Sequence, residues 1–298
     1  MNTRLTPIAI RSLLFFLTLV GGLMACQAIE NRQREPILSD QVPEVEQTRE
    51  VKILTVFFGL DNALPPRARA MYKNAAGQDG MPIVFSHEVD PETLDGTDFE
   101  VTTQDGTKHV VEFATLLPAE EEFELRTALL IGEYGNYPDN PPVSLEVIDD
   151  LITRTGVNYK GKTQSVIDLP SGPIFSYAEY FTLDDDYPYL AEGNGCDCPK
   201  EGTTQVVKAV WSGGVRALNG EELGEAERED FTVTLVQGTD TLQVVPYMLA
   251  DLGDGDNNTD LCLKEAGTPI YVQANANIAI DPRDDPNPAT GIAVVSRW

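Results

Sequence analysis

An ordered internal repeat constrains this chain most, because both copies must be able to adopt the same fold. The segment DFEVTTQDGT (98–107) returns 132 residues later as DFTVTLVQGT (230–239). Shorter matches keep the same order along the chain: FGLDNALP with FTLDDDYP, VFSHEV with VWSGGV, PPVSLEV with TPIYVQA, and SVID with AVVS. Self-similarity at a fixed period indicates that one structural unit has been duplicated. We therefore predict two related modules, residues 51–169 and 170–298.

Each module has the pattern of short β-strands. Runs such as DFEVTT and VSLEVI alternate or are wholly apolar, and Gly, Pro and Asp bound them. Several such strands in succession are typical of a β-sandwich. The best helix candidate is PPRARAMYKNAAGQDG (65–80), which has prolines at its start and glycines at its end.

One stretch of the first module resembles a known family. Residues 81–106 resemble the front half of bacterial immunoglobulin-like domains, which occur in surface-layer and cell-envelope proteins. The shared phrase, F-S-x-x-V-D-x-x-T followed by F-x-V, is carried here by Phe85, Ser86, Val89, Asp90, Thr93, Phe99 and Val101. The second module departs from it, with Arg216 where the first has Asp90. The resemblance implies an all-β fold of two tandem, diverged immunoglobulin-like β-sandwiches, and domains that mostly act as spacers, binding modules or stalks.

The first residues predict export and a lipid anchor. Two arginines precede an apolar run that is too short for a spanning helix, which is the pattern of an export signal. Leu23-Met24-Ala25-Cys26 resembles the lipobox of bacterial lipoproteins, which implies that residues 1–25 are a signal peptide and that Cys26 carries the lipid, such as palmitate. Gln27 follows, and by the same resemblance it favours the outer membrane over the inner one. The alternative is an ordinary signal peptide with an incidental cysteine.

The segment after Cys26 predicts a flexible tether. Residues 26–50 are polar and charged and contain no aromatic residue, so they cannot bury enough surface to offset the entropy of ordering. No later apolar run is long enough to cross a bilayer, and we expect the lipid to be the only anchor. The formal net charge of −27 would repel nucleic acid, which excludes it as an expected partner. The acidity fits solubility, a saline habitat or cation binding.

Three cysteines remain once Cys26 is assigned to the lipid: Cys196, Cys198 and Cys262. An exported protein meets an oxidising compartment, so a disulfide is expected. A bridge across the single residue between Cys196 and Cys198 would be strained. We predict that Cys262 pairs with Cys196 or Cys198.

The acidic run DGDNNTDLCLKE (254–265) has the spacing of an EF-hand calcium loop. Asp254, Asp256, Asn258 and Asp260 take loop positions 1, 3, 5 and 7, and Glu265 takes position 12. Position 6, however, is a threonine, where that loop needs glycine, and the flanking residues do not predict a pair of helices.

The repeat changes this interpretation, because TDLCL aligns with the predicted strand TALLI of the first module. An extended chain would carry Glu265 roughly 16 Å beyond Asp260, which removes it from a shared site. We therefore predict a calcium site from Asp254, Asp256 and Asn258, joined by Asp251 or Asp260.

The alternative is an acidic turn without metal. The first module has Glu122, Glu124 and Arg126 at the places of Asp254, Asp256 and Asn258, and we expect Arg126 to neutralise its neighbouring glutamates.

Catalytic motifs are scarce. His87 and His109 lie on predicted surface strands and are expected to face solvent, and they are too few to complete a zinc site with the cysteines. There is no GxSxG, HExxH or phosphate-binding glycine loop.

The sequence thus predicts a membrane-anchored envelope lipoprotein with a binding, adhesion or structural role and an unidentified envelope or extracellular ligand. The alternative is an exported hydrolase with carboxylate or metal chemistry at an acidic site between the modules. A deep pocket there, holding several carboxylates and a histidine, would favour the hydrolase.

Overall fold

The chain folds into β-strands and short 3-10 helices in the part that a computed structural model describes, residues 49–121, 123–183, 196–250 and 253–297. All of these residues belong to one compact unit. No α-helix occurs in the described ranges, and none of the helices there is long and apolar enough to span a membrane. The all-β fold class is confirmed. The predicted signal peptide, Cys26 and most of the tether lie outside the described residues.

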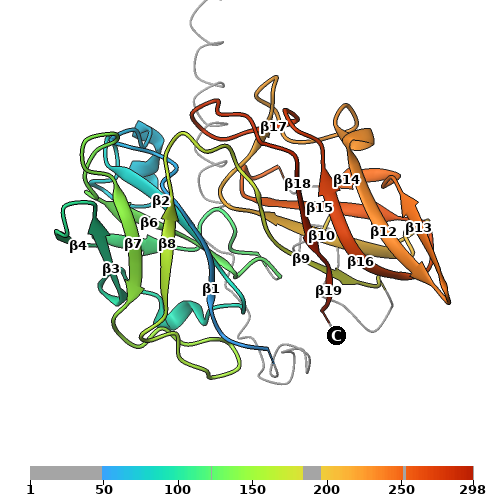
Figure 1. Ribbon diagram of the computed structural model, residues 1–298, viewed down its shortest axis with the longest axis horizontal. Helices are drawn as coiled ribbons and strands as arrows, with labels where there is room; N and C mark the ends of the chain where they lie inside the picture. Colours follow the sequence, from blue (N-terminus) through green and yellow to red (C-terminus); the bar gives the residue numbers. More distant parts are fainter. Residues whose placement is uncertain (1–48, 122, 184–195, 251–252, 298) are drawn as a thin grey trace, which may run out of the picture. The chain divides into compact units, whose positions relative to one another are not determined.

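Strands β1 to β8 form the first sandwich, coloured blue to yellow-green in Figure 1. Their order is β4-β3-β7-β8-β1-β2-β6-β5, and β8 joins two layers by pairing antiparallel with β7 and parallel with β1. If β1 to β8 are lettered A, B, C, C′, D, E, F and G in chain order, the two layers are A-B-E-D and C′-C-F-G, the arrangement of an immunoglobulin-like sandwich. The strand bounds are β1 Ile53–Phe57, β2 Asp79–Phe85, β3 Phe99–Thr103, β4 Lys108–Val110, β5 Phe113–Thr115, β6 Thr127–Gly132, β7 Pro142–Val147 and β8 Thr163–Ile167.

Strands β9 to β19 form the second sandwich, and they have the same order in space. One layer is β14-β15-β10-β9-β19 and the other is β13-β12-β16-β18, with β11 and β17 as an added pair. The counterpart of β8 is split here into β18, which pairs with β16, and β19, which runs parallel to β9. The strand bounds are β9 Phe175–Phe181, β10 Gln205–Trp211, β11 Arg216–Ala217, β12 Phe231–Gln237, β13 Asp240–Val244, β14 Met248–Ala250, β15 Asn258–Leu263, β16 Thr268–Ala274, β17 Ala279–Ile280, β18 Thr290–Ala293 and β19 Val295–Ser296.

The structural correspondence follows the sequence repeat. The aligned segments fall on β2 and β10, β3 and β12, β6 and β15, and β7 and β16, which occupy equivalent places in the two strand orders. The predicted module boundary lies in the connection between β8 and β9.

The predicted helix over residues 65–80 is wrong. Only Pro66–Ala70 is helical, as a 3-10 turn without a side-chain cap, and β2 already begins at Asp79. The backbone N–H of Leu64 donates to the carbonyl of Gln78, and Gly80 pairs with Leu60. These pairings across the segment close it into a loop, so tertiary contacts override the local signals. The remaining 3-10 turns are η3 Pro91–Thr93, η4 Gly96–Asp98 and η6 Arg228–Asp230.

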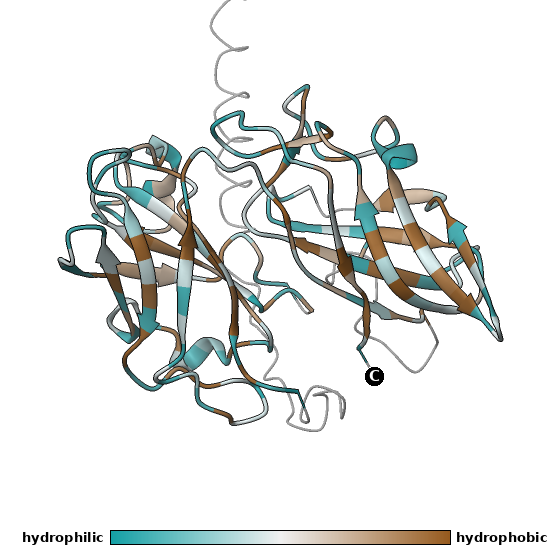
Figure 2. Cartoon of the chain, viewed as in Figure 1, coloured by the Kyte–Doolittle hydropathy of each residue, from teal (hydrophilic) through white to brown (hydrophobic). Residues whose placement is uncertain are grey.

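The core of the second sandwich shows how alternation builds the layers. Phe231, Val233 and Leu235 on β12 are fully buried, while the residues between them are half-buried. Figure 2 shows the resulting alternation of apolar and polar bands along β12 and β16. The centroids of the Trp211 and Phe175 rings lie 4.4 Å apart, and Trp211 meets Phe231 edge-on. These rings fill the space between the layers.

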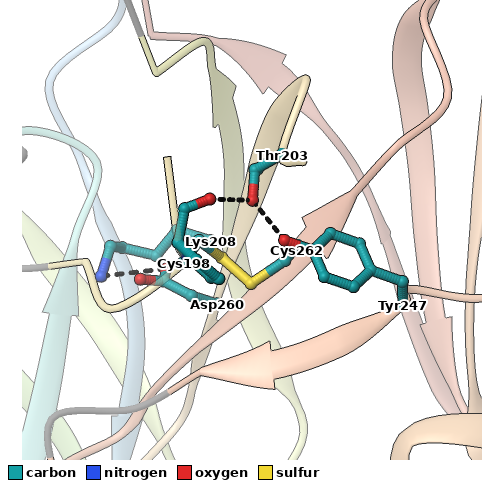
Figure 3. The surroundings of a disulfide bond; sticks show 7 residues. Cys198, Thr203, Lys208, Tyr247, Asp260 and Cys262 are labelled. Atoms are coloured by element: carbon teal, nitrogen blue, oxygen red, sulfur yellow. Dashed lines mark hydrogen bonds and ion pairs between the residues drawn. A yellow bond between two sulfur atoms is a disulfide. The ribbon is translucent and has the colours of Figure 1, made fainter. Parts of the chain in front are cut away.

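The disulfide joins Cys198 to Cys262 on β15, which confirms the predicted bridge and selects Cys198 as the partner (Figure 3). Cys196 is a buried free thiol. Next to the bridge, the hydroxyl of Thr203 lies 2.6 Å from that of Tyr247. The bridge ties the segment before β10 to the C-terminal end of β15.

Replacing Cys262 by serine should lower the free energy of unfolding by about 4 kcal/mol, because the bridge closes a loop with a sequence separation of 64 residues. Urea denaturation under non-reducing conditions would measure the change. The control is Cys196→Ser, which should keep the bridge and most of the stability. Loss of the disulfide in Cys196→Ser, detected by thiol counting, would show that the pairing is wrong.

Candidate functional site

In the structure, the described residues that were predicted to bind calcium interact with different partners. The backbone N–H of Asn258 donates to Asp256 Oδ1 at 2.7 Å, and its side-chain amide donates to Asp256 Oδ2, so this pair closes the turn before β15. Asp260 lies on β15, 3.1 Å from Lys208 Nζ. Asp251 lies outside the described residues. Asp254 joins a cluster of carboxylates from the first sandwich.

Asp254 meets two glutamates of the first sandwich. One carboxylate oxygen from each of Glu121, Glu124 and Asp254 lies within 4.8 Å of the other two. Burial, and then the charges of Glu124 and Asp254, raise the pKa of Glu121 to about 7. Burial and the charge of Glu124 likewise raise the pKa of Asp254 to about 6. The ionised cluster is therefore electrostatically costly.

A second group of charges is buried where the two sandwiches meet. Arg297 binds Glu88 of the first sandwich at 2.5 Å and also pairs with Glu179 on β9. Arg154 binds the other oxygen of Glu88 at 2.7 Å, and Arg126 lies 3.3 Å from Glu179. All five side chains are at most 5% exposed. We call them the junction network: Glu88, Arg126, Arg154, Glu179 and Arg297.

Aromatic rings and hydroxyls complete the junction network. The guanidinium of Arg297 lies 3.8 Å from the centroid of the Phe123 ring, and that of Arg126 lies 4.4 Å from the Tyr177 ring. The Tyr177 hydroxyl donates to Glu179 at 3.1 Å. Desolvated ion pairs depend on hydrogen bonds and close geometry to repay the loss of water, and here each of the two carboxylates lies within 3.3 Å of two guanidinium groups.

The network controls the ionisation of its carboxylates. Burial opposes the charge of Glu88, but Arg297, Arg154 and Arg126 outweigh it and lower the pKa of Glu88 to about 2. The same balance of burial against Arg297 and Arg126 lowers the pKa of Glu179. Both carboxylates therefore stay ionised at neutral pH.

Lys208 holds a third buried contact across the junction. Its Nζ lies 2.9 Å from Glu124 of the first sandwich and 3.1 Å from Asp260 beside it in the sheet (Figure 3 shows the Asp260 contact). On β10, Val207, Ala209 and Trp211 face the core of their own sandwich. Lys208 lies on the opposite face, which is equally buried.

Glu179 and Lys208 escaped the sequence analysis, although a signal for them exists. β10 reads QVVKAVW and β9 reads FSYAEYF, each with one charge in an otherwise apolar or aromatic run. A strand that is apolar at both odd and even positions is buried on both faces. A single charge within it must therefore meet an opposite charge from another element. Arg126 pairs with Glu179, and Glu124 pairs with Lys208. The expected neutralisation of Glu122 by Arg126 falls outside the described residues.

His87 is buried at 1% exposure, so its predicted solvent-facing position is wrong. Its Nδ1 lies 2.8 Å from the Ser86 hydroxyl, which also accepts from the backbone N–H of Lys52 and donates to the carbonyl of Glu50. Ser86 is only 4% exposed, which shows that other residues rather than solvent surround this Ser–His pair. A nucleophile needs an approach path for its substrate, which this pair lacks. His109 lies half-buried on β4.

Two cavities in the described part of the chain bear on the hydrolase alternative. One of about 470 Å³ is lined by Ile167, Ser171, Gly172, Ile174 and residues 276–277 and 286–288, and none of these side chains is acidic or a histidine. The other, of about 140 Å³, lies between the sandwiches, and Asp256 is its one carboxylate. Neither has the several carboxylates and the histidine that the hydrolase alternative requires.

Comparisons with known proteins give only distant similarities. No protein-family model and no curated protein matches the sequence. The N-terminal part of the bacterial S-layer protein SbsC matches with a TM-score of 0.29 and 12% identity, over 84% of this chain and 45% of that one. A second SbsC structure has a TM-score of 0.27 and 10% identity over 76% and 42% of the two chains. E. coli α-2-macroglobulin matches with a TM-score of 0.26 and 12% identity, over 83% of this chain and 20% of that one.

This chain thus spans less than half the length of the first of these proteins. TM-scores of this size carry no inference about its function.

The low pKa of Glu88 predicts acid sensitivity. A carboxylate whose folded pKa of about 2 lies below its unfolded value of 4.5 contributes stability above pH 4.5, which is lost as the pH falls through 2. We expect the free energy of unfolding to fall as the pH drops from 4.5 to 2. The slope of this free energy against pH should be smaller in Glu88→Gln, because glutamine does not titrate. Urea denaturation at several pH values measures both slopes.

The matched control is Glu201→Gln, at an exposed turn, which removes the same charge and should leave the slope unchanged. Equal slopes for Glu88→Gln and wild type would show that Glu88 titrates normally.

Proposed function

We propose that the protein is a lipid-anchored cell-envelope protein with a structural or binding role, in which the two sandwiches act as one rigid body. The observation that carries the proposal is the sharing of Arg297 by Glu88 of the first sandwich and Glu179 of the second. Tandem domains usually move relative to one another unless their interface is large and apolar. Here a movement would expose or separate charges that are fully desolvated, so the interface favours one orientation.

Further contacts support a rigid junction. The amide of Asn257 donates to the Thr127 hydroxyl at 3.0 Å, and the hydroxyls of Thr55 and Ser176 lie 2.8 Å apart. Val84 packs with Tyr177 and Val210. A rigid double sandwich can hold a surface at a constant distance from its attachment point, which suits a spacer or a platform for an unidentified envelope or extracellular ligand.

The anchor rests on the lipobox-like residues before Cys26. In this proposal a lipid on Cys26 attaches the chain to the outer membrane, and residues 26–50 separate the double sandwich from the bilayer. The acidic composition fits this role, because net charge keeps a surface domain soluble and discourages self-association.

Replacing Arg297 by methionine tests the rigid junction. Glu88 and Glu179 would each lose a buried cation, so we expect the unfolding free energy to drop by about 3 kcal/mol or more. Calorimetry should give a single transition for the wild type and two separate transitions for the variant. Arg216→Met removes the exposed ion pair with Asp284 and should change little. Two independent transitions in the wild type would contradict the proposal.

Replacing Cys26 by serine tests the anchor. We expect labelling with radioactive palmitate to be lost and the protein to leave the membrane fraction, since serine cannot carry the thioether-linked lipid. Cys196→Ser, which changes another thiol in the same way, should be labelled like the wild type. Equal labelling of Cys26→Ser and wild type would exclude the lipid anchor.

A further inference from the structure

Two loops at equivalent places in the two sandwiches bring three carboxylates together. Glu121 and Glu124 precede β6, and Asp254 precedes β15, the counterpart of β6. One oxygen from each lies within 4.8 Å of the other two. Two oxygens that bind one calcium ion at 2.3–2.6 Å are at most about 5 Å apart, so a single ion can reach all three.

Unpartnered buried oxygens are an independent sign of a missing ligand. Glu124 is 4% exposed, and its Oε1 lies 2.9 Å from Lys208 Nζ, but its Oε2 is buried without a hydrogen bond. Glu121 Oε2 is likewise buried and accepts no hydrogen bond. Leaving a buried acceptor unpaired costs free energy that a bound cation would restore.

The charges around the cluster do not balance. Lys208 is shared between Glu124 and Asp260, so one ammonium faces two carboxylates before Glu121 and Asp254 are counted. The carboxylate of Glu222 adds to the negative charge around Asp254. Even without Glu222, four carboxylates face one ammonium, an excess of negative charge that a divalent cation would reduce.

We propose that Glu121, Glu124 and Asp254 form a calcium site that links the two sandwiches. The site keeps one residue of the EF-hand-like run, Asp254, and takes its other protein ligands from the first sandwich. Hard carboxylate oxygens suit Ca²⁺, and water can complete its coordination. The site does not depend on the lipid anchor or on the role in the envelope.

Calorimetric titration of the full chain with CaCl₂, after EDTA treatment and dialysis, tests the site. The wild type should bind one Ca²⁺, and Asp254→Asn and Glu121→Gln should each bind at least about tenfold more weakly, because each loses a charged ligand. Glu265→Gln is the matched control: it removes the same charge from the end of the EF-hand-like run and should bind like the wild type. Mg²⁺ should bind more weakly, since its shorter bonds require closer oxygens.

The melting temperatures of the same proteins, with and without calcium, distinguish a calcium ligand from a residue that is only structural. Without calcium, Asp254→Asn should melt above the wild type, because it relieves repulsion with Glu121 and Glu124. With saturating calcium the order should reverse, since binding stabilises the wild type by mass action. The proposal is overturned if the wild type binds no Ca²⁺ at millimolar concentration, or if Asp254→Asn and Glu121→Gln bind as tightly as Glu265→Gln. Tighter binding of Mg²⁺ would overturn the assignment to calcium.

Discussion

The junction network is the interaction on which the arrangement of the described residues depends. Glu88 and Glu179 come from different sandwiches, and Arg297 binds both while fully buried. Each charge has been removed from water, so its free energy depends on the position of its partners. Apolar contact alone would allow one sheet to slide over another, whereas a set of paired charges favours a single relative position of the two sandwiches. In the rigid junction that we propose, the network contributes specificity of orientation.

The same junction explains why β9 and β10 depart from simple alternation. Strand β12 alternates buried and half-buried residues, because one face meets the core and the other is partly exposed. Every residue of β10 is buried, because its second face is covered by the first sandwich. The two sandwiches share one strand order, and Glu179 and Lys208 on the covered face of the second pair with Arg126 and Glu124 of the first.

Much of the fold could be predicted from the sequence. Short strands with Gly, Pro and Asp at their ends mark β-sandwiches locally, and the repeat located equivalent strands such as β6 and β15. The helix predicted at 65–80 failed because Leu64 pairs with Gln78 across the segment and Gly80 lies opposite Ile131 of β6, contacts that local signals do not reveal. His87 failed for a related reason: it lies just past the end of β2, where chain from elsewhere covers it.

The candidate sites show the limit more sharply. Asp254 stood out in the sequence, but its neighbours Glu121 and Glu124 lie some 130 residues away in the chain and belong to the other sandwich. The sequence likewise left open whether Cys262 pairs with Cys196 or Cys198, and only the tertiary structure shows that Cys198 lies within bonding distance.

The sequence by itself determined the strands, their repeated order and the acidic character, because these depend on side-chain periodicity and composition within short segments. Only the tertiary structure decided which charges meet, since Glu88 and Arg297 are 209 residues apart and their contact exists only when both sandwiches are formed and docked.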